Sequence, residues 1–401
     1  MVLTASSAGA CPPDRSGREK GRIEKLVREY FVARDKGWLG AEPSSLAAGK
    51  LADGRVAPAA VRQASVTANI ARQLADERGL RATAVHTGLA RKNRIQIRGH
   101  KATAKVTAGT ALSWNVTSVG DSSFSDAYVV RLQKEGRSWK ILDVSYAPIP
   151  STDTPGKGKR PAADSRTPAA KPATHGGTQR PVVRPAAALR YNRQAAAEYA
   201  LRWSRSSVLY NGDLLVGDQY NPEYDVSRQD NDCTNFASQV LRAGGWPIHD
   251  GWASDNPVNW TPDLWGPRGP SKTWSVASWL YDYAGNAKRG EKWRIWPPED
   301  DNMDIWNLQP GDLLFADWDP NGHYDGVIDH TMVISGSYTE LGFTEPTYSQ
   351  HTPHRRNVPL SVGIKIATAP KPPVDPGDGM GGQGRTPKYY PVHLKDTFSP
   401  D

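Results

Sequence analysis

The chain of 401 residues contains two cysteines, Cys11 and Cys233, and a thiol is one of the few side chains able to attack an amide carbonyl. Cys11 lies in an N-terminal stretch that we expect to be disordered, so a structural disulfide between the two residues is not expected. Cys233 is therefore predicted to be a free thiol. To act as a nucleophile it must be held as a thiolate, which requires positive charge or helix N–H groups nearby.

The sequence around Cys233 predicts a helix that begins at this residue. Apolar and small side chains recur at the spacing of one helix face, at positions 233, 236, 237, 240 and 241. Asp232 is a favourable N-cap residue, and Gly244-Gly245 marks the C-terminal end. Cys233 would then sit where unpaired N–H groups and the helix dipole stabilise an anion. The alternative is a small buried cysteine on a core helix.

His330 is the predicted base for this thiol. It lies in an apolar run, residues 326–334, that predicts a buried strand, where an imidazole is desolvated at a cost unless it has a partner or a function. Residues 309–315 and 347–351 predict further strands. A thiol on a helix, an imidazole on a strand and a polar orienting residue on the next strand form a papain-like site. Gln350 and His351 point to opposite faces of their strand, so only one of them can orient His330.

Several motifs follow one another in this half of the chain: Asp232-Cys233-Thr234-Asn235-Phe236, Gly244-Gly245-Trp246-Pro247, Ser271-Lys272-Thr273-Trp274-Ser275, Gly311-Asp312-Leu313-Leu314, Asp329-His330-Thr331-Met332-Val333 and His351-Thr352-Pro353-His354-Arg355. With them, residues 191–365 resemble the bacterial family called "Putative amidase domain", which is related to the NlpC/P60 cysteine peptidases. The resemblance implies an α+β, papain-like fold with Cys233 as nucleophile and His330 as base, and it favours His351 as the orienting residue. It also implies cleavage of peptide bonds of the bacterial cell wall through a thioester.

The same motifs contain candidates for substrate binding or for an oxyanion hole: Asp232, Tyr224, Asn235, Gln350 and Trp274. No cofactor is expected. Two other functions remain open. An acyltransferase would use the same cysteine and histidine with an amine in place of water, and a non-catalytic wall-binding protein would keep only the fold. The presence of both Cys233 and His330 favours an enzyme.

One stretch resembles the opening of a calcium-binding loop: Asp317, Asp319, Asn321 and Asp325. Ile328 stands where such a loop needs a bidentate Glu, so a polar turn is expected rather than a metal site. The tryptophans at positions 246, 252, 260, 265 and 274 could line a cleft, although most are expected to be core residues.

The length and the composition predict two folded domains with low-complexity segments around them. The expected order is a disordered N-terminus or signal-peptide remnant (1–20), an α+β accessory domain (21–150), a Pro/Ala/Lys-rich linker (151–188), the amidase domain (189–370) and a disordered tail (371–401). Ala8-Gly9-Ala10 has the form of a signal cleavage site. No run of 18 apolar residues occurs in the sequence.

In the accessory domain, the hydrophobic spacing predicts helices over residues 21–31 and 59–79. Alternation of period two then predicts strands, ending in a hairpin of residues 126–132 and 138–144. Helices followed by an antiparallel meander resemble the cone-shaped folds similar to nuclear transport factor 2.

Charge is distributed unevenly along the chain. Residues 1–150 carry 24 basic and 13 acidic side chains, whereas residues 191–370 carry 14 basic and 23 acidic ones. The basic half predicts a nearby anionic wall polymer or membrane surface, with an ordinary solvated surface as the alternative. Nucleic acid is not expected as a partner, because the basic residues follow no motif of the usual DNA- or RNA-binding proteins. A secreted or wall-associated protein is expected, with the cytoplasm left open.

Overall fold

A computed structural model describes most of the two predicted domains. The described residues are 15–40, 54–147, 189–205, 207–210, 213–217, 219–224, 232–251, 253–262, 269–297, 304–318, 326–340, 342–369 and 387–398. They form a mixed α+β structure, which confirms the predicted class. The linker 151–188 lies outside the described residues.

The N-terminal half, residues 15–147, consists of helices followed by antiparallel strands. Its elements are α1 (Arg15–Asp35), η1 (Lys36–Leu39), α3 (Pro58–Arg78), β1 (Ala82–Leu89), β2 (Arg94–Arg98), β3 (Lys101–Trp114), η2 (Thr117–Val119), β4 (Ser122–Glu135) and β5 (Ser138–Tyr146). Both predicted helices and the predicted hairpin are present. α1 begins at Arg15, so residues 15–20 are helical rather than part of a disordered N-terminus.

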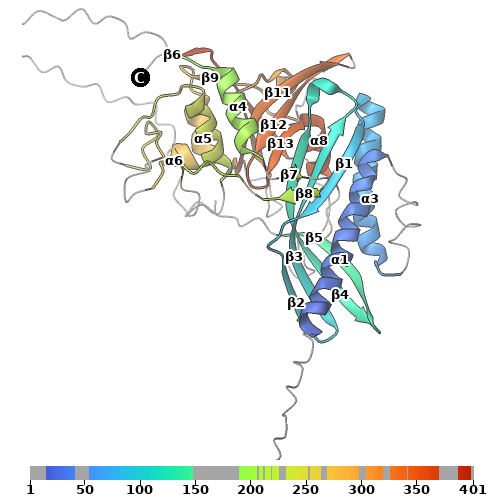
Figure 1. Cartoon of the computed structure of the whole chain (residues 1–401). Helices are drawn as coiled ribbons and strands as arrows, with labels where there is room; N and C mark the ends of the chain where they lie inside the picture. Colours follow the sequence, from blue (N-terminus) through green and yellow to red (C-terminus); the bar gives the residue numbers. More distant parts are fainter. Residues whose placement is uncertain are drawn as a thin grey trace, which may run out of the picture.

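The two long helices lie along one face of this sheet (Figure 1). Alternate residues of β3, such as Ala102, Ala104 and Val106, point toward them and are buried, while Lys101 and Lys105 point the other way and are exposed. This period-two pattern arises because one face of the sheet is covered and the other is open.

The C-terminal half, residues 189–398, builds a second set of antiparallel strands with helices around them. Its elements are β6 (Leu189–Arg190), α4 (Arg193–Trp203), β7 (Ser207–Tyr210), β8 (Asp213–Val216), α5 (Cys233–Ala243), α6 (Lys272–Ser275), α7 (Ala277–Ala284), β9 (Gly290–Lys292), η3 (Asp304–Asn307), β10 (Leu313–Asp317), β11 (His330–Glu340), β12 (Phe343–Gln350), β13 (Arg355–Pro359), α8 (Leu360–Thr368), β14 (Lys388–Leu394) and β15 (Thr397–Phe398).

One antiparallel sheet runs through both halves. Its order is β1-β3-β4-β13-β12-β11-β10-β14-β9, with β2 on β3 and β5 on β4. The junction is a short pairing in which Phe124 of β4 lies opposite Arg355 of β13. The two predicted domains are therefore joined through a common sheet, which was not predicted from the sequence.

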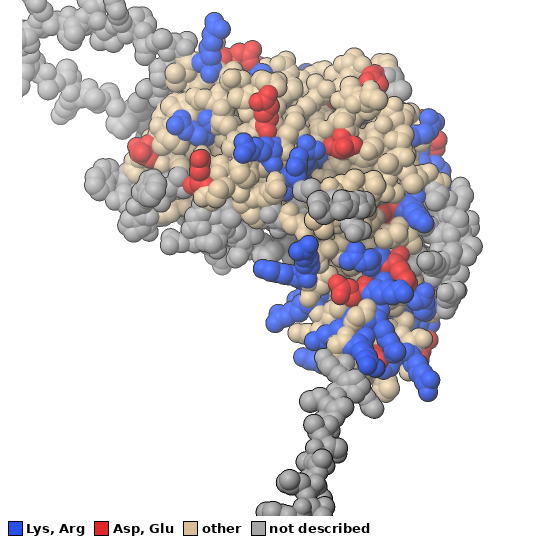
Figure 2. Space-filling model, viewed as in Figure 1, with Lys and Arg blue, Asp and Glu red and all other residues tan. Residues whose placement is uncertain are grey.

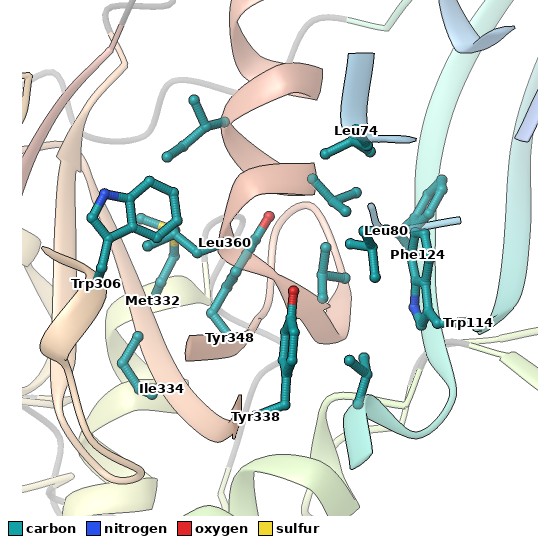
Figure 3. Close-up of a cluster of buried hydrophobic side chains, with 14 of the residues drawn as sticks. Leu74, Leu80, Trp114, Phe124, Trp306, Met332, Ile334, Tyr338, Tyr348 and Leu360 are labelled. Atoms are coloured by element: carbon teal, nitrogen blue, oxygen red, sulfur yellow. The ribbon is translucent and has the colours of Figure 1, made fainter. Parts of the chain in front are cut away.

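A shared hydrophobic core reinforces this junction. Figure 3 shows Leu74, Leu80, Trp114 and Phe124 from the N-terminal half packed against Tyr338 and Tyr348 from the C-terminal half. Next to this core, the buried guanidinium of Arg355 donates to Asp126 Oδ1 at 2.8 Å. Removing either partner would leave the other charge buried and unpaired, at a cost of about 3–5 kcal/mol.

The predicted disordered tail requires a correction. Residues 388–394 form β14, which pairs with β10 on one side and with β9 on the other. β15 then pairs with β6, so the two ends of the C-terminal half meet. The prediction failed because the Pro/Gly-rich stretch before β14 dominated the composition of the segment, and because Pro391 lies within the strand itself.

No helix among the described residues is long and apolar enough to cross a lipid bilayer.

Candidate active site

α5 begins at Cys233, as the hydrophobic spacing predicted, and its first nine residues are all buried. The side chain of Cys233 is only 2% exposed. Thr234, the next residue, connects the helix to the sheet: its Oγ1 lies 3.0 Å from Thr331 Oγ1 on β11 and 3.6 Å from Cys233 Sγ. The thiol therefore lies at the end of the sheet where β11 begins, in the first turn of the helix, where the helix dipole favours an anion.

Asp232 occupies the N-cap position of α5, but its carboxylate does not bond to a backbone N–H of the helix. Instead, Oδ1 accepts a hydrogen bond from Asn235 Nδ2, and Oδ2 lies 2.5 Å from His351 Nδ1. The predicted capping bond is thus replaced by two side-chain contacts. The carboxylate directs its negative charge toward an imidazole rather than toward the helix.

His351 follows β12 and lies on the same side of the sheet as α5. Its ring stacks on Phe236, one turn after Cys233, with centroids 4.1 Å apart and planes at 21°. Its Nε2 lies 2.8 Å from the backbone oxygen of Trp203. Because a carbonyl oxygen only accepts hydrogen bonds, Nε2 of His351 donates its proton to Trp203 O. His351 thus lies between Asp232 and the carbonyl of Trp203, adjacent to the first turn of α5.

His330 occupies the opposite face of the sheet at the same end. Thr331 points toward α5, and successive side chains of a strand alternate, so the ring of His330 points away from it. The ring stacks on Trp318, with centroids 4.0 Å apart, and is 3% exposed. Its burial lowers its pKa to about 3, with the Gln350 side chain acting in the opposite direction. His330 is thus a neutral imidazole in an apolar setting.

The structure does not connect the three predicted catalytic residues by hydrogen bonds. The ring of His330 has no hydrogen bond to Cys233 or to His351 among the described residues, and its buried Nε2 has no hydrogen-bond partner there. Gln350, rather than His351, lies beside His330, and its Nε2 donates to Pro353 O at 2.9 Å. The prediction that Gln350 and His351 face opposite sides is confirmed, but the pairing of His351 with His330 is not what the structure shows.

Three of the other predicted site residues form one buried polar network with His351. Trp274 Nε1 donates to Asn235 Oδ1 at 2.6 Å, and Asn235 in turn donates to Asp232. The chain of contacts thus runs from α6 through α5 to the turn after β12. Tyr224 stacks on Trp274, with centroids 5.8 Å apart, and is partly exposed. These residues fix the position of the Asp232 carboxylate.

Two residues of this cluster had been given no role from the sequence. Tyr220 places its hydroxyl 3.2 Å from His354 Nε2, and its ring meets that of His351 edge-on. Burial, together with the neighbouring charges of His351 and Arg355, lowers the pKa of His354 well below its usual value. For His354, the signal in the sequence that could have indicated a role was its spacing from His351 in the motif that begins there.

The calcium-loop candidate can be assessed at one position. The buried carboxylate of Asp317 accepts a hydrogen bond from the backbone N–H of Gly326 at 3.2 Å. Asp319, Asn321 and Asp325 lie outside the described residues. Within the described ranges, no group of three or more His, Cys, Asp or Glu side chains is arranged to hold a metal ion. Trp246, Trp260 and Trp274 are fully buried core residues, whereas Trp252 and Trp265 also lie outside the described residues.

Comparison with known proteins gives one family match, which lies in this half of the chain. Residues 190–370 match the family model described as "Putative amidase domain", which supports an enzyme that hydrolyses amides. No curated protein matches the chain. A solved structure described as a "Putative Scytalone Dehydratase" from Novosphingobium aromaticivorans is 14% identical and covers 33% of this chain and 87% of its own, with a TM-score of 0.23.

Proposed function

We propose that the C-terminal half hydrolyses an amide bond through a thioester on Cys233. The observation that carries the proposal is the position of this thiol at the first residue of α5, beside the His351–Asp232 pair. The helix N-terminus and an imidazolium both favour the thiolate. The family match at residues 190–370 supports an amide substrate.

The reaction proceeds in two steps. The Cys233 thiolate attacks the amide carbonyl carbon, the C–N bond breaks, and the amine leaves with a proton, which produces a thioester. Water then attacks the thioester, releases a carboxylic acid and restores the thiol. The leaving amine needs a proton donor on the α5 face. We assign this role to His351 rather than to His330, because the ring of His351 lies beside the first turn of α5.

Asp232 then acts as the carboxylate that holds Nδ1–H of His351, in the manner of a Ser-His-Asp triad. For His351 to reach the substrate, its Nε2–H must exchange the Trp203 carbonyl for the leaving nitrogen. The Trp274–Asn235 contacts restrain Asp232 during this exchange. In this assignment His330 and Gln350 support the end of the sheet from the opposite face.

For the substrate we propose a peptide bond of the bacterial cell wall, cleaved outside the cytoplasm. The support is the resemblance of the motifs around Cys233 and His330 to a family whose relatives act on such bonds. A papain-like origin of the fold belongs to the same proposal.

The test combines digestion and trapping. Purified cell wall is incubated with the full chain, and the released products are identified by mass spectrometry. Wild type is expected to release new amino and carboxyl termini in equal amounts, whereas Cys233→Ala releases none. An amide-like electrophile should modify Cys233 in wild type. Cys11→Ala, which removes the other thiol, is the matched control and should behave as wild type.

Three outcomes would contradict the proposal. Undiminished cleavage by Cys233→Ala would exclude the thioester, and an adduct confined to Cys11 would exclude Cys233 as the reactive thiol. If an added amine captured the acyl group in preference to water, the enzyme would be an acyltransferase rather than a hydrolase.

A further inference from the structure

The N-terminal half has a sheet face that no helix covers. On β2, Arg94, Gln96 and Arg98 are exposed, while Ile95 and Ile97 between them point toward the core beneath α1. On β3, the same outer face carries Lys101, Thr103 and Lys105. We call the four cations Arg94, Arg98, Lys101 and Lys105 the basic face.

The basic face consists of like charges placed directly opposite one another. Arg94 pairs in register with Lys105, and Arg98 pairs with Lys101. Side chains that face each other across antiparallel strands lie about 5 Å apart, and like charges in such positions destabilise the sheet. A solvated surface that only needed solubility would be more stable with charges of both signs interspersed. We therefore expect these four cations to have a function that compensates the lower stability of the sheet.

No acidic side chain among the described residues forms an ion pair with any of these four cations. Other cations near them are neutralised in part: Lys140 lies 3.3 Å from Glu135, and Arg131 lies 3.8 Å from Asp143. Figure 2 shows Lys and Arg side chains gathered over the part of the molecule that contains β2, β3 and β4, whereas the larger upper part carries mixed charges. The positive potential is thus concentrated on one end of the molecule.

The neighbouring part of the same outer face is already occupied. Gly88 of β1 and Gly109 of β3 lie opposite one another, and β8 packs on them so closely that a Cβ at Gly88 would overlap the backbone oxygen of Leu214. The hairpin β7–β8 therefore covers the sheet next to the basic face. None of the described helices or strands covers the basic face itself.

We propose that the basic face binds a linear polyanion of the cell wall, recognised through its phosphodiester groups. Guanidinium groups match phosphate oxygens in a bidentate fork, and the two cation pairs lie about 13 Å apart along the strands, so that an extended chain can contact both. The face carries no aromatic ring on which a base could stack, and none of the exposed large apolar side chains lies on it. These two features favour a polymer read by charge alone over single-stranded nucleic acid or membrane insertion.

This site lies on the opposite part of the sheet from Cys233 and needs no catalysis. Only the choice of a wall polymer over other phosphodiester chains rests on the proposed function. The binding experiment therefore succeeds or fails independently of amide hydrolysis.

The test measures binding of the full chain to poly(glycerol phosphate) as a function of salt concentration. The variant Arg94→Gln/Arg98→Gln/Lys101→Gln/Lys105→Gln removes the basic face. The control Lys36→Gln/Arg62→Gln/Arg72→Gln/Lys288→Gln removes four exposed charges from other faces. Vesicles with anionic phospholipid, duplex DNA and neutral dextran are measured in parallel.

Wild type is expected to bind the polymer with a steep salt dependence. The basic-face variant should bind at least about tenfold more weakly, and its slope of log affinity against log salt should be smaller in magnitude by about three. The control should lose less than about threefold. The basic-face variant should melt at the same temperature as wild type or higher, because its like-charge pairs are gone.

Equal losses in the two quadruple variants would overturn the proposal, since binding would then follow net charge alone. Tighter binding of vesicles or duplex DNA than of the polymer, at equal phosphate concentration, would also overturn it. A higher melting temperature with unchanged polymer binding would show that the basic face is not the binding site.

Discussion

Two histidines occupy opposite faces of the sheet at the point where β11 begins and β12 ends, and their surroundings differ in every respect that matters for catalysis. His351 faces α5, and its two ring nitrogens contact a carboxylate and a backbone carbonyl. His330 faces the other way, stacks on Trp318, and has its pKa lowered to about 3 by burial. In the proposed mechanism the first supplies a proton to the reaction at Cys233, whereas the second is neutral at physiological pH.

The comparison shows that a histidine in an apolar strand is not by that fact a catalytic base. The alternation of side chains along the strand decides on which face of the sheet its ring lies. Alternation alone does not tell which face is covered by the helix that carries the nucleophile. Here the contact between Thr234 and Thr331 settles the question, because it assigns Thr331 to the α5 face and so His330 to the other.

The largest effect that separates the two histidines should be on turnover. His351→Ala is expected to lower kcat by about 10²–10⁴-fold, because the reaction loses its proton donor and the thiolate loses a neighbouring cation. His330→Ala should lower kcat per folded molecule by less than about tenfold. The measurement is the rate of wall-peptide release, corrected for the folded fraction by circular dichroism.

Added imidazole provides a further control for this pair. It should partly restore turnover in His351→Ala, where a small base can occupy the vacated position, and should not do so in His330→Ala. A larger kcat loss in His330→Ala than in His351→Ala would assign the base to His330 and reverse the comparison.

Asp232→Asn tests the carboxylate that contacts Nδ1 of His351. The amide retains an acceptor for Asn235 but lacks the negative charge that stabilises the imidazolium, so kcat should fall by about 10- to 100-fold. KM should change little, because the carboxylate holds His351 rather than the substrate. A change confined to KM would mean that Asp232 contacts the substrate directly.

The stability of the fold should respond to pH through His330. Its folded pKa of about 3 lies below the unfolded value of about 6.5. Between these values only the unfolded chain binds the proton, so the free energy of unfolding is highest above pH 6.5 and falls as the pH is lowered. Denaturation in urea should show a loss of about 2 kcal/mol from this residue between pH 6.5 and pH 5.

His330→Leu should flatten this dependence, leaving the part that His354 contributes by the same mechanism. Thr331→Val, the neighbouring substitution that removes no titrating group, should keep the slope of wild type. An unchanged slope in His330→Leu would mean that His330 is protonated in the folded protein.

The smallest effect is expected at Gln350. Gln350→Ala removes one buried hydrogen bond, to Pro353 O, and should lower the free energy of unfolding by about 1 kcal/mol while kcat stays within about threefold. A loss of kcat comparable to that of His351→Ala would show that Gln350 orients a catalytic imidazole, as the alternative assignment requires.

Local features of the site could be predicted from the sequence, and long-range ones could not. The start of α5 at Cys233 follows from the spacing of its apolar residues, and the opposite orientations of Gln350 and His351 follow from strand alternation. The pairing of Phe124 with Arg355 involves residues 231 positions apart and leaves no periodic signal. The role of Asp232 was also hidden, because an Asp before a helix predicts a cap whether or not an imidazole competes for it.

The positions of β14 and β15 impose an order on how the protein can be made. β14 lies between β10 and β9, so the sheet that supports Cys233 lacks β14, and β9 lacks its partner, until residues 388–394 have left the ribosome. The separate pair of β6 and β15 forms after residues 397–398 have followed. During synthesis, the N-terminal half can fold first, while edges of the strands in the C-terminal half are still unpaired. The edge of β10 that β14 covers therefore stays unpaired until residues 388–394 have been synthesised, although α5 and His351 come earlier in the chain.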